Sequence, residues 1–464
     1  MTALSAVVVT AAGCVYFNRL YNANRLFEMG RREIEAGRVG SGQANLAEAI
    51  EKAERVVREH PNSRWADDAL RLIVQARILR QEWPAAAERG EQLLDYAKSP
   101  RDSAKVAGYL GIANLNLGAI APADSLLSVA LASDLDETTR ANLHLNRGRA
   151  RIALGRSEEA EADLTAALEL RPDWVEPRLE LVRLLAATGS GERTAAETQR
   201  LLRQPLNAAE QAAVRNLTQY LASTSPAVAV DALADVENSS LLRDERAQLI
   251  KLRGDLKIEL GRVEEGLADY DLVSSSAPES RAAVEAQTAV IARQVRRATV
   301  PGELEGPLAD MMRIHLIPAA RTSPEAGRLR DMLIRMDFWV ETGGLGYVAA
   351  AEAARDELHA PALARNLFLR YAEEEPNALW APKAILAALD LSGLDSRGPD
   401  PEQLRRRLLE DYSDSGYVQA MTGGNDPRFT FEDLEQGLQR QLERMKRLAD
   451  EEVRNRTAER SRRR

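Results

Sequence analysis

The chain has 464 residues, of which 29% are charged and only 5% aromatic, and its formal net charge is -9 at pH 7. This acidic balance argues against general nucleic-acid binding, which needs a basic surface. A single cysteine excludes a disulfide framework and any zinc site built from several cysteines. Alanine, leucine, glutamate and arginine dominate, a composition typical of exposed amphipathic helices.

The one cysteine follows a short apolar run at the N-terminus. Residues 3–12 are almost wholly apolar, too short a run to span a bilayer but suited to the core of a signal peptide. Ala11, Ala12 and Gly13 come directly before Cys14. These residues resemble a bacterial lipobox, in which the cysteine is acylated and becomes the mature N-terminus. The pattern departs from that family at Ala11, where leucine is usual, and in lacking a basic residue before the apolar run.

The lipobox resemblance implies that residues 1–13 are a lipoprotein signal peptide and that lipidated Cys14 attaches the protein to a membrane. A second interpretation stays open. The segment is then a short apolar N-terminus with a chance cysteine, and the protein is soluble and not lipidated.

The clearest repeated pattern runs from Gly148 to Pro172. Gly148 and Ala160 suit the close crossing of two antiparallel helices, because a larger side chain at either position would force the helices apart. Gly155 suits the left-handed end of the first helix, and Pro172 ends the second. Large and small apolar residues complete the spacing, at Leu164 and Ala167. This pattern resembles the tetratricopeptide repeat (TPR), a helix–turn–helix unit of about 34 residues.

The same offsets recur elsewhere in the chain. Copies of the pattern begin at Gly37, Gly111 and Gly254, the first with Ala49, Ala53, Val56 and Pro61 at the expected places. The step from Gly148 to Gly254 is close to three repeats, so two degenerate repeats are expected between them. The predicted fold class is therefore all-α, a TPR-type α-solenoid in which antiparallel helix pairs form a right-handed superhelix.

The pattern weakens toward the C-terminus, which suggests a division of the chain. We expect an N-terminal TPR solenoid over 14–278 and degenerate helical repeats continuing it over 279–420. Prolines interrupt the helices between 280 and 342.

Residues 429–464 are predicted to form a long C-terminal helix and a basic tail. The helix carries one apolar stripe, formed by Leu434, Leu438, Leu442, Met445 and Leu448. It could cover the last layer of the repeat array, as a terminal cap does. Alternatively the stripe is a coiled-coil seam or a docking helix, with Arg462, Arg463 and Arg464 reaching anionic lipid or protein. The sequence leaves both interpretations open.

No catalytic, cofactor or metal site is predicted. The four histidines are scattered, without a metal-binding spacing. The segment TGSGER from Thr188 lacks the lysine of a phosphate-binding loop and follows a helix rather than a strand. We therefore expect a protein that is not an enzyme and has no small-molecule substrate.

Binding of proteins or peptide segments is the expected activity, in a concave groove lined by the first helix of each repeat. The predicted groove residues are Ile112, Leu115, Leu145, Arg149, Ile152, Lys251, Asp255 and Ile258. An alternative for the apolar ones is packing against neighbouring helices. The lysine and asparagine positions of a carboxylate clamp are occupied by Gly108, Ile112, Leu145 and Arg149, so such a clamp is not expected.

Helix junctions extend the resemblance to one group of TPR lipoproteins. The segments HPNSRWADDA at 60–69 and EPNALWAPKA at 375–384, with DYSDSGYV at 411–418, resemble the junctions of lipoproteins related to the outer-membrane assembly component BamD. This resemblance implies a scaffold lipoprotein on the periplasmic face of the bacterial outer membrane, acting in outer-membrane-protein assembly. The alternative is a soluble TPR adaptor of the cytoplasm or periplasm.

Overall fold

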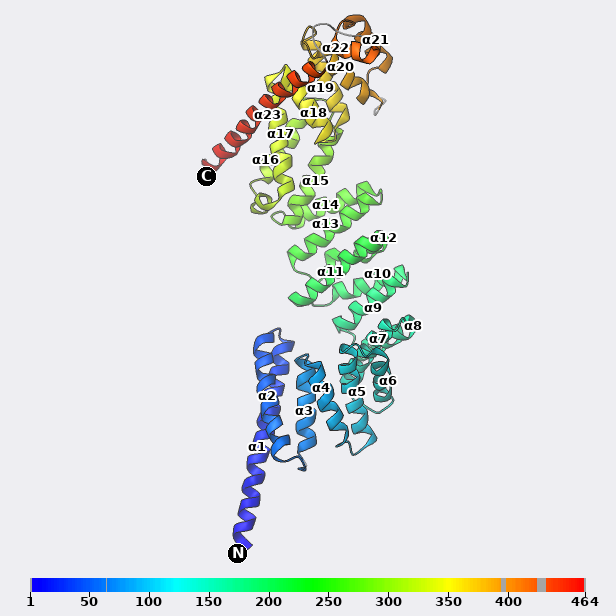
Figure 1. Ribbon diagram of the computed structural model, residues 1–464, viewed down its shortest axis with the longest axis vertical. Coiled ribbons are helices and arrows are strands. Elements are labelled where there is room, and N and C mark those ends of the chain that lie inside the picture. The colour runs from blue at the N-terminus through cyan, green and yellow to red at the C-terminus, as the bar shows by residue number, and fades with distance from the viewer. Residues whose placement is uncertain (1, 64, 394–397, 424–430, 463–464) are drawn as a thin grey trace. The chain divides into compact units, whose positions relative to one another are not determined.

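The computed structural model describes the backbone of residues 2–63, 65–393, 398–423 and 431–462, and the side chains of residues 19–458 within those ranges. Throughout these ranges the regular secondary structure is helical, and successive helices pack as antiparallel pairs (Figure 1). The chain is an all-α solenoid of the TPR type, as predicted. It divides into two compact units, residues 1–240 and 241–464, called unit 1 and unit 2 below.

Across the described ranges, no helix combines the length and the apolar character that crossing a membrane requires.

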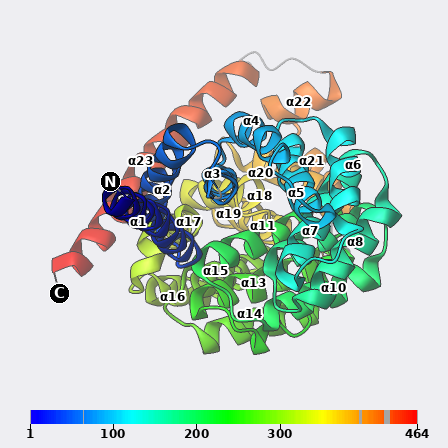
Figure 2. The same cartoon turned by 90° about the horizontal axis from the view of Figure 1, so that it is seen from below.

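Unit 1 is a stack of helix pairs in which each pair packs on the next. The first helices of successive pairs also touch one another, α1 on α3, α3 on α5, α5 on α7 and α7 on α9. Figure 2 shows α3, α5 and α7 on the inner side of this unit and α4, α6 and α8 on its outer side. The pairs are α1 (Thr2–Glu35) with α2 (Val39–Glu59), α3 (Ala66–Leu79) with α4 (Trp83–Leu94), α5 (Pro100–Asn116) with α6 (Ile120–Leu131), α7 (Glu137–Ala153) with α8 (Ser157–Leu170), α9 (Val175–Ala187) with α10 (Gly191–Arg203), and α11 (Ala208–Thr224) with α12 (Pro226–Ala232).

Small residues set the distance between the two helices of a pair. A Cβ added to Gly148 would lie 3.2 Å from the Leu164 side chain and 3.4 Å from the carbonyl oxygen of Ala160. One added to Gly111 would lie 2.7 Å from Leu127. The turn residue Gly155 has φ 73°, the left-handed conformation that glycine adopts without steric cost. These positions confirm the roles predicted from their spacing, and α9–α12 supply the two degenerate repeats expected before Gly254.

The first pair has a different register from the predicted one. Gly37, with φ 78°, lies in the turn between α1 and α2, and an added Cβ there would meet nothing within 4 Å. The close crossing is made by Gly30 and Gly42, since a Cβ on either would lie within 3.0 Å of the other's carbonyl oxygen. Gly37 thus corresponds to Gly155 and not to Gly148. The error arose because α2 has 21 residues and α8 only 14, which moves the terminating proline of the first pair further along the chain.

Unit 2 begins with a regular pair and becomes irregular after it. The 3₁₀ turns η2 (Pro301–Leu304) and η3 (Pro318–Thr322) separate its middle helices where the sequence has its prolines. The predicted division at residue 278 falls inside this unit, between α14 and α15, which pack together. The repeat motif weakens there, but the packing does not. The helices are α13 (Arg243–Glu259), α14 (Val263–Ser276), α15 (Arg281–Arg297), α16 (Glu305–Ile314), α17 (Pro324–Thr342), α18 (Leu345–Asp356), α19 (Pro361–Glu374), α20 (Ala381–Ser392), α21 (Pro401–Asp411), α22 (Gly416–Thr422) and α23 (Phe431–Arg462).

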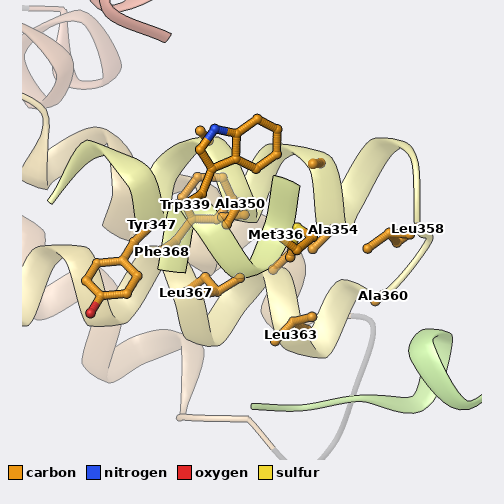
Figure 3. Packing of buried hydrophobic residues seen from close by; sticks show 14 of the residues in the cluster. Met336, Trp339, Tyr347, Ala350, Ala354, Leu358, Ala360, Leu363, Leu367 and Phe368 are labelled. Carbon is orange, nitrogen blue, oxygen red and sulfur yellow. The ribbon is translucent and has the colours of Figure 1, made fainter. Parts of the chain in front are cut away.

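The core of unit 2 is centred on α17, α18 and α19. Trp339 and Met336 of α17 are buried against alanines of α18, and Phe368 of α19 closes the layer (Figure 3). The run of alanines in α18 lets the neighbouring helices approach closely, while the tryptophan fills the space beside them. This core gives α23 a surface to cover.

The C-terminal helix α23 packs along α17 and α18. Leu438 and Leu442 are buried, and the indole N–H of Trp339 donates to the carbonyl oxygen of Met445 at 3.1 Å. Unit 2 itself therefore buries the apolar stripe of α23, as expected for a terminal cap. The helix does this by packing back along the earlier helices α17 and α18. One predicted stripe member is wrong: Leu448 is 40% exposed, and Ala449 is buried in its place. The side chain of Arg462, and the whole of Arg463 and Arg464, lie outside the described residues.

Two leucines of α23 make a matched test of this packing. Leu438→Ala should lower the free energy of unfolding of unit 2 by about 2–5 kcal/mol, because it leaves a cavity in a buried layer. Leu448→Ala should change it by less than about 0.5 kcal/mol, as exposed positions do. Urea unfolding of the two variants measures both. Equal losses would contradict the burial of Leu438 and the exposure of Leu448 in this packing.

Candidate protein-binding groove

An open groove crosses the first helices of four successive pairs in unit 1. It has a volume of about 410 Å³ and lies over α1, α3, α5 and α7. Its apolar lining comes from Phe27, Ile78, Leu79, Ile112 and Leu143. Polar and charged groups stand among these side chains, chiefly Arg31, Arg71, Gln75, Lys105, Tyr109 and Asn142. A surface of this mixed kind suits a polypeptide segment with both apolar and polar side chains.

A second hollow continues the groove between α1 and α3. Arg71 and Gln75 line both hollows, so the two adjoin at these side chains. The second hollow has a volume of about 450 Å³ and is floored by Leu20 and Leu72. Two aromatic side chains, Tyr21 and Trp65, stand at its sides.

The groove residues occupy fixed positions relative to the turn that ends each first helix. Counting back ten and six residues from Gly37 gives Phe27 and Arg31, and from Gln81 it gives Arg71 and Gln75. The same count from Gly118 gives Gly108 and Ile112, and all six residues line the groove. A separation of four residues keeps both members on one face of a helix. The repeat thus dictates where binding residues can stand.

Hydrogen bonds hold several groove side chains in place. The amide of Gln75 donates to the hydroxyl of Tyr109 at 2.5 Å, which joins α3 to α5. Burial raises the pKa of Tyr109, so its hydroxyl stays neutral at physiological pH. Asp136 caps α7 by accepting from the backbone N–H and hydroxyl of Thr139, at 2.9 and 2.8 Å. These bonds hold the pKa of Asp136 below its usual range, so it is ionised.

The three basic groups of the groove differ in their pairing. Arg31 forms ion pairs with Glu28 at 2.6 Å and Glu35 at 3.0 Å, and Arg71 forms one with Asp68 at 3.3 Å. Lys105, half-buried on α5, has no carboxylate within 4 Å among the residues that the structure describes. Its charge nevertheless contributes to lowering the pKa of Asp102 and Asp136. Lys105 therefore lies near two carboxylates, Asp102 of its own helix and Asp136 of the groove, at more than ion-pair distance.

A buried ion-pair network fixes α7, which carries one wall of the groove, onto α8. Asp163 of α8 is 2% exposed and receives two hydrogen bonds from Arg147, at 2.7 and 2.9 Å, and one from Arg151 at 2.8 Å. His144 Nδ1 lies 2.8 Å from the same carboxylate. Burial by itself raises the pKa of Asp163, but the bonds from His144 and Arg147 outweigh it, and the net pKa lies below the usual range. Unit 2 repeats the arrangement with Arg253 on Asp269, at 2.8 and 3.0 Å.

The structure places the predicted groove residues of unit 1 in different environments. Ile112 lies in the groove, and Leu115 is half-buried on the same helix. The structure corrects the prediction that Leu145 lines the groove. This side chain is 1% exposed and packs in the core with Leu164, so it cannot face a partner. Arg149 pairs with Glu176 and Glu180 of α9, at 2.7 and 3.3 Å, and Ile152 is 36% exposed further along α7. Neither lines the groove.

The predicted residues of unit 2 belong to a separate body. Lys251 pairs with Asp255 at 2.7 Å, and Asp255 also accepts a hydrogen bond from Tyr270. Ile258 lies against the α13–α14 crossing, where a Cβ on Gly266 would approach it to 2.5 Å. Lys251, Asp255 and Tyr270 thus interact with one another within unit 2, and Ile258 packs at a helix crossing there. The backbone of Cys14 is part of α1, and its side chain lies outside the described residues.

Several groove residues were missed by the sequence analysis, chiefly Phe27, Arg71, Gln75 and Lys105. Phe27 was missed because the sequence analysis assigned the wrong register to the first helix pair. The pair α3–α4 has no glycine in its turn: Gln81 takes the left-handed conformation there, with φ 59°. A count from the turn residue instead of from the crossing glycine would have found Arg71 and Gln75.

In the part of the chain that the structure describes, no three His, Cys, Asp or Glu side chains are grouped so that they could hold a metal ion.

Comparison with known proteins gives structural likeness without a family assignment. No protein-family model and no curated protein matches the chain. A TPR protein from Parabacteroides merdae is 17% identical, with 55% of this chain and 94% of that chain covered and a TM-score of 0.33. A thermophilic TPR protein of Thermus thermophilus is 23% identical, with 42% and 99% covered and a TM-score of 0.33. PilF of Pseudomonas aeruginosa is 16% identical, with 59% and 99% covered and a TM-score of 0.31. The assignment to the TPR type of solenoid therefore rests on the helix crossings of this chain itself.

The buried network gives a pH-dependent prediction. Asp163→Asn should destabilise unit 1 by about 3 kcal/mol at pH 7, because it removes a buried carboxylate that pairs with Arg147, Arg151 and His144. The depressed pKa of Asp163 means that its contribution is fully present above the unfolded value of about 4 and is lost as pH falls through the folded value. The difference between the two proteins in urea unfolding should therefore shrink below about pH 4. A difference that stays constant down to pH 2 would contradict this role of the carboxylate.

Proposed function

We propose that this protein is a non-enzymatic scaffold that binds a segment of a partner protein in the groove of unit 1. The observation that carries the proposal is the open groove over α1, α3, α5 and α7, with half-buried apolar side chains beside charged ones. Each of the four helices contributes residues from the face that its own pair leaves uncovered. A groove that combines apolar and charged side chains in this way suits the binding of a polypeptide segment.

The groups in the groove are arranged for recognition. The hydroxyl of Tyr109 is neutral and held by Gln75, and Asp136 is ionised and held by Thr139. A general acid or base needs a pKa near the working pH, and neither shift moves its group in that direction. Fixed donors and acceptors beside apolar patches instead supply orientation and specificity to a bound chain. This supports a binding role for the site.

Site-specific cross-linking tests the groove as the binding surface. A photoreactive benzoylphenylalanine in place of Ile112 should cross-link a partner protein in cells, because Ile112 lines the groove. The same residue in place of Val129 provides the control, since Val129 is 60% exposed on α6, a helix of the outer side. Products should form at position 112 and not at 129. Equal products at both positions, or products at 129 alone, would count against the groove.

We further propose that Cys14 is lipidated and holds the protein at the periplasmic face of the bacterial outer membrane, with a role in outer-membrane-protein assembly. This proposal is supported by the small residues before Cys14 and by the helix junctions that resemble BamD-like lipoproteins. Tyr21 of the groove follows Cys14 by only seven residues. An anchor at Cys14 would therefore keep the aromatic end of the groove near the membrane surface.

Fractionation of cells tests the anchor. Cys14→Ser should move the protein from the membrane fraction to the soluble one after a carbonate wash, because stable attachment requires the acyl chains. Globomycin should cause the precursor of the unaltered protein to accumulate. A serine variant that stays in the membrane without partner proteins, or an unaltered protein found only in soluble fractions, would favour the soluble adaptor instead.

A further inference from the structure

The outer face of α23, which lies opposite to the side that packs on α17 and α18, is basic. Four arginines stand on it, Arg440, Arg444, Arg447 and Arg454, called the arginine row below. We propose that the arginine row binds the surface of a bilayer that contains anionic phospholipid. This inference goes beyond the proposed function, because it concerns unit 2 and depends neither on the groove of unit 1 nor on Cys14.

The period of the helix places the row on one face. Separations of four, three and seven residues keep side chains on the same side of an α-helix. All four arginines are exposed, whereas Leu438, Leu442 and Ala449 on the opposite side are buried. α23 is one unbroken helix over this stretch (Figure 1). At a rise of 1.5 Å per residue, the distance along the helix from Arg440 to Arg454 is about 21 Å. The row is thus a long, exposed line of positive charge.

The pairing of the row differs from that of other charges on α23. Among the residues that the structure describes, no carboxylate lies within 4 Å of any of the four guanidinium groups. Arg440 and Arg447 each donate one hydrogen bond, to the backbone carbonyl oxygens of Gln436 and Glu443 at 3.2 and 3.4 Å. The described carboxylates of Glu443 and Glu451, nearest in the helical register, also lie beyond ion-pair distance. Since a guanidinium has five N–H donors, most donors of the row remain available to an anion.

Other charged side chains of α23 are paired with the helix beneath it. Arg456 forms ion pairs with Asp337 of α17 at 2.6 Å and with Glu452 of its own helix at 2.7 Å. Asp450 forms one with Arg335 of α17 at 2.9 Å. These acidic groups are therefore engaged on the inner side of α23, and the positive charge of the row faces outward.

The charge of this end of the chain is opposite to that of the whole. Residues 440–464 contain ten basic and five acidic residues, a net charge of +5, whereas the chain carries -9. Clusters of basic residues on a helix are attracted to bilayers with anionic headgroups, and each residue near the surface raises the affinity roughly fivefold. Charge complementarity thus identifies the occupant as an anionic surface.

The composition of the outer face favours lipid headgroups over a protein or a nucleic acid. Between Gln436 and Arg454, all within the described residues, Leu448 is the one large apolar side chain that is exposed. A protein interface has an apolar core that is depleted of charge, and single-stranded nucleic acid is bound by stacking on aromatic side chains. Attraction of headgroups requires only positive charge at an exposed surface, which the row provides.

Vesicle sedimentation of the full chain tests the proposal. The protein carries Cys14→Ser throughout, so that no acyl chain contributes, and its C-terminal tail is unchanged. It should bind vesicles of phosphatidylglycerol and phosphatidylcholine but not vesicles of phosphatidylcholine alone. Salt at about 0.5 M should release it, because the charges are then screened. Arg440→Gln, Arg444→Gln and Arg447→Gln together should weaken this binding about tenfold or more.

Two further variants separate the row from positive charge in general. Arg101→Gln, Arg296→Gln and Arg297→Gln together remove the same charge from exposed positions of α5 and α15, and should leave the affinity unchanged. Lysine at the three positions of the row should preserve binding, since headgroups respond to charge and not to the planar fork of arginine. Thermal melting should be the same for all variants, because these side chains are exposed.

Several results would overturn the proposal. No binding to the anionic vesicles, equal binding to neutral ones, or equal losses in the two glutamine variants would contradict the role of the row. A lysine variant that fails to bind would show that the arginine fork is required, as for carboxylates of a protein partner. A labelled duplex DNA provides the alternative anion, and binding of DNA without binding of vesicles would assign the row to a nucleic acid. None of these results bears on the groove of unit 1, which cross-linking at Ile112 tests.

Discussion

The close crossing of two helices at small residues is the constraint on which the rest of the structure depends. Where Gly148 meets Ala160 and Leu164, an added Cβ would lie 3.2 Å from the Leu164 side chain, which would then have to shift. The same crossing recurs at Gly111 with Leu127, and at Gly30 with Gly42. Each crossing fixes the orientation of one pair, and the next pair then packs on it. The fold is therefore a sum of local interactions.

The groove is a consequence of that arrangement. Once the second helix covers one face of the first, the residues ten and six positions before the turn face away from the pair. In α1, α3 and α5 these positions hold apolar, basic and amide side chains, which remain partly accessible. In α13 the corresponding residues are Lys251 and Asp255, which pair with each other. The same positions thus serve binding in unit 1 and internal stability in unit 2.

Much of the fold was predictable, because its determinants are local. Glycine, alanine and proline at fixed spacing predicted the pairs α5–α6, α7–α8 and α13–α14, and also the turns within them. The first pair was misplaced because α2 is unusually long, and spacing alone cannot reveal the length of a helix. The apolar stripe of α23 was mostly correct, but only its contacts with α17 and α18 show that the buried face passes through Ala449.

The groove was less predictable than the fold. Ile112 was found because its pair has the full motif, whereas Arg71 and Gln75 belong to a pair whose turn residue is Gln81. Leu145 has the position of a groove residue but is buried, because it packs in one cluster with Leu164 of α8 and Leu181 of α9. Position in a repeat predicts which way a side chain points, while the neighbouring pair decides whether it is accessible.

Hydrogen exchange on Ala160→Trp tests most directly the claim that local crossings build this protein. Ala160 is fully buried, and the indole should force α7 and α8 apart at a cost of about 1–3 kcal/mol or more. Because each pair contacts only its neighbours, amide protection should fall in α7, α8 and the adjacent helices and stay unchanged in residues 241–464. A uniform loss of protection along the whole chain would show a single cooperative core and would contradict the account.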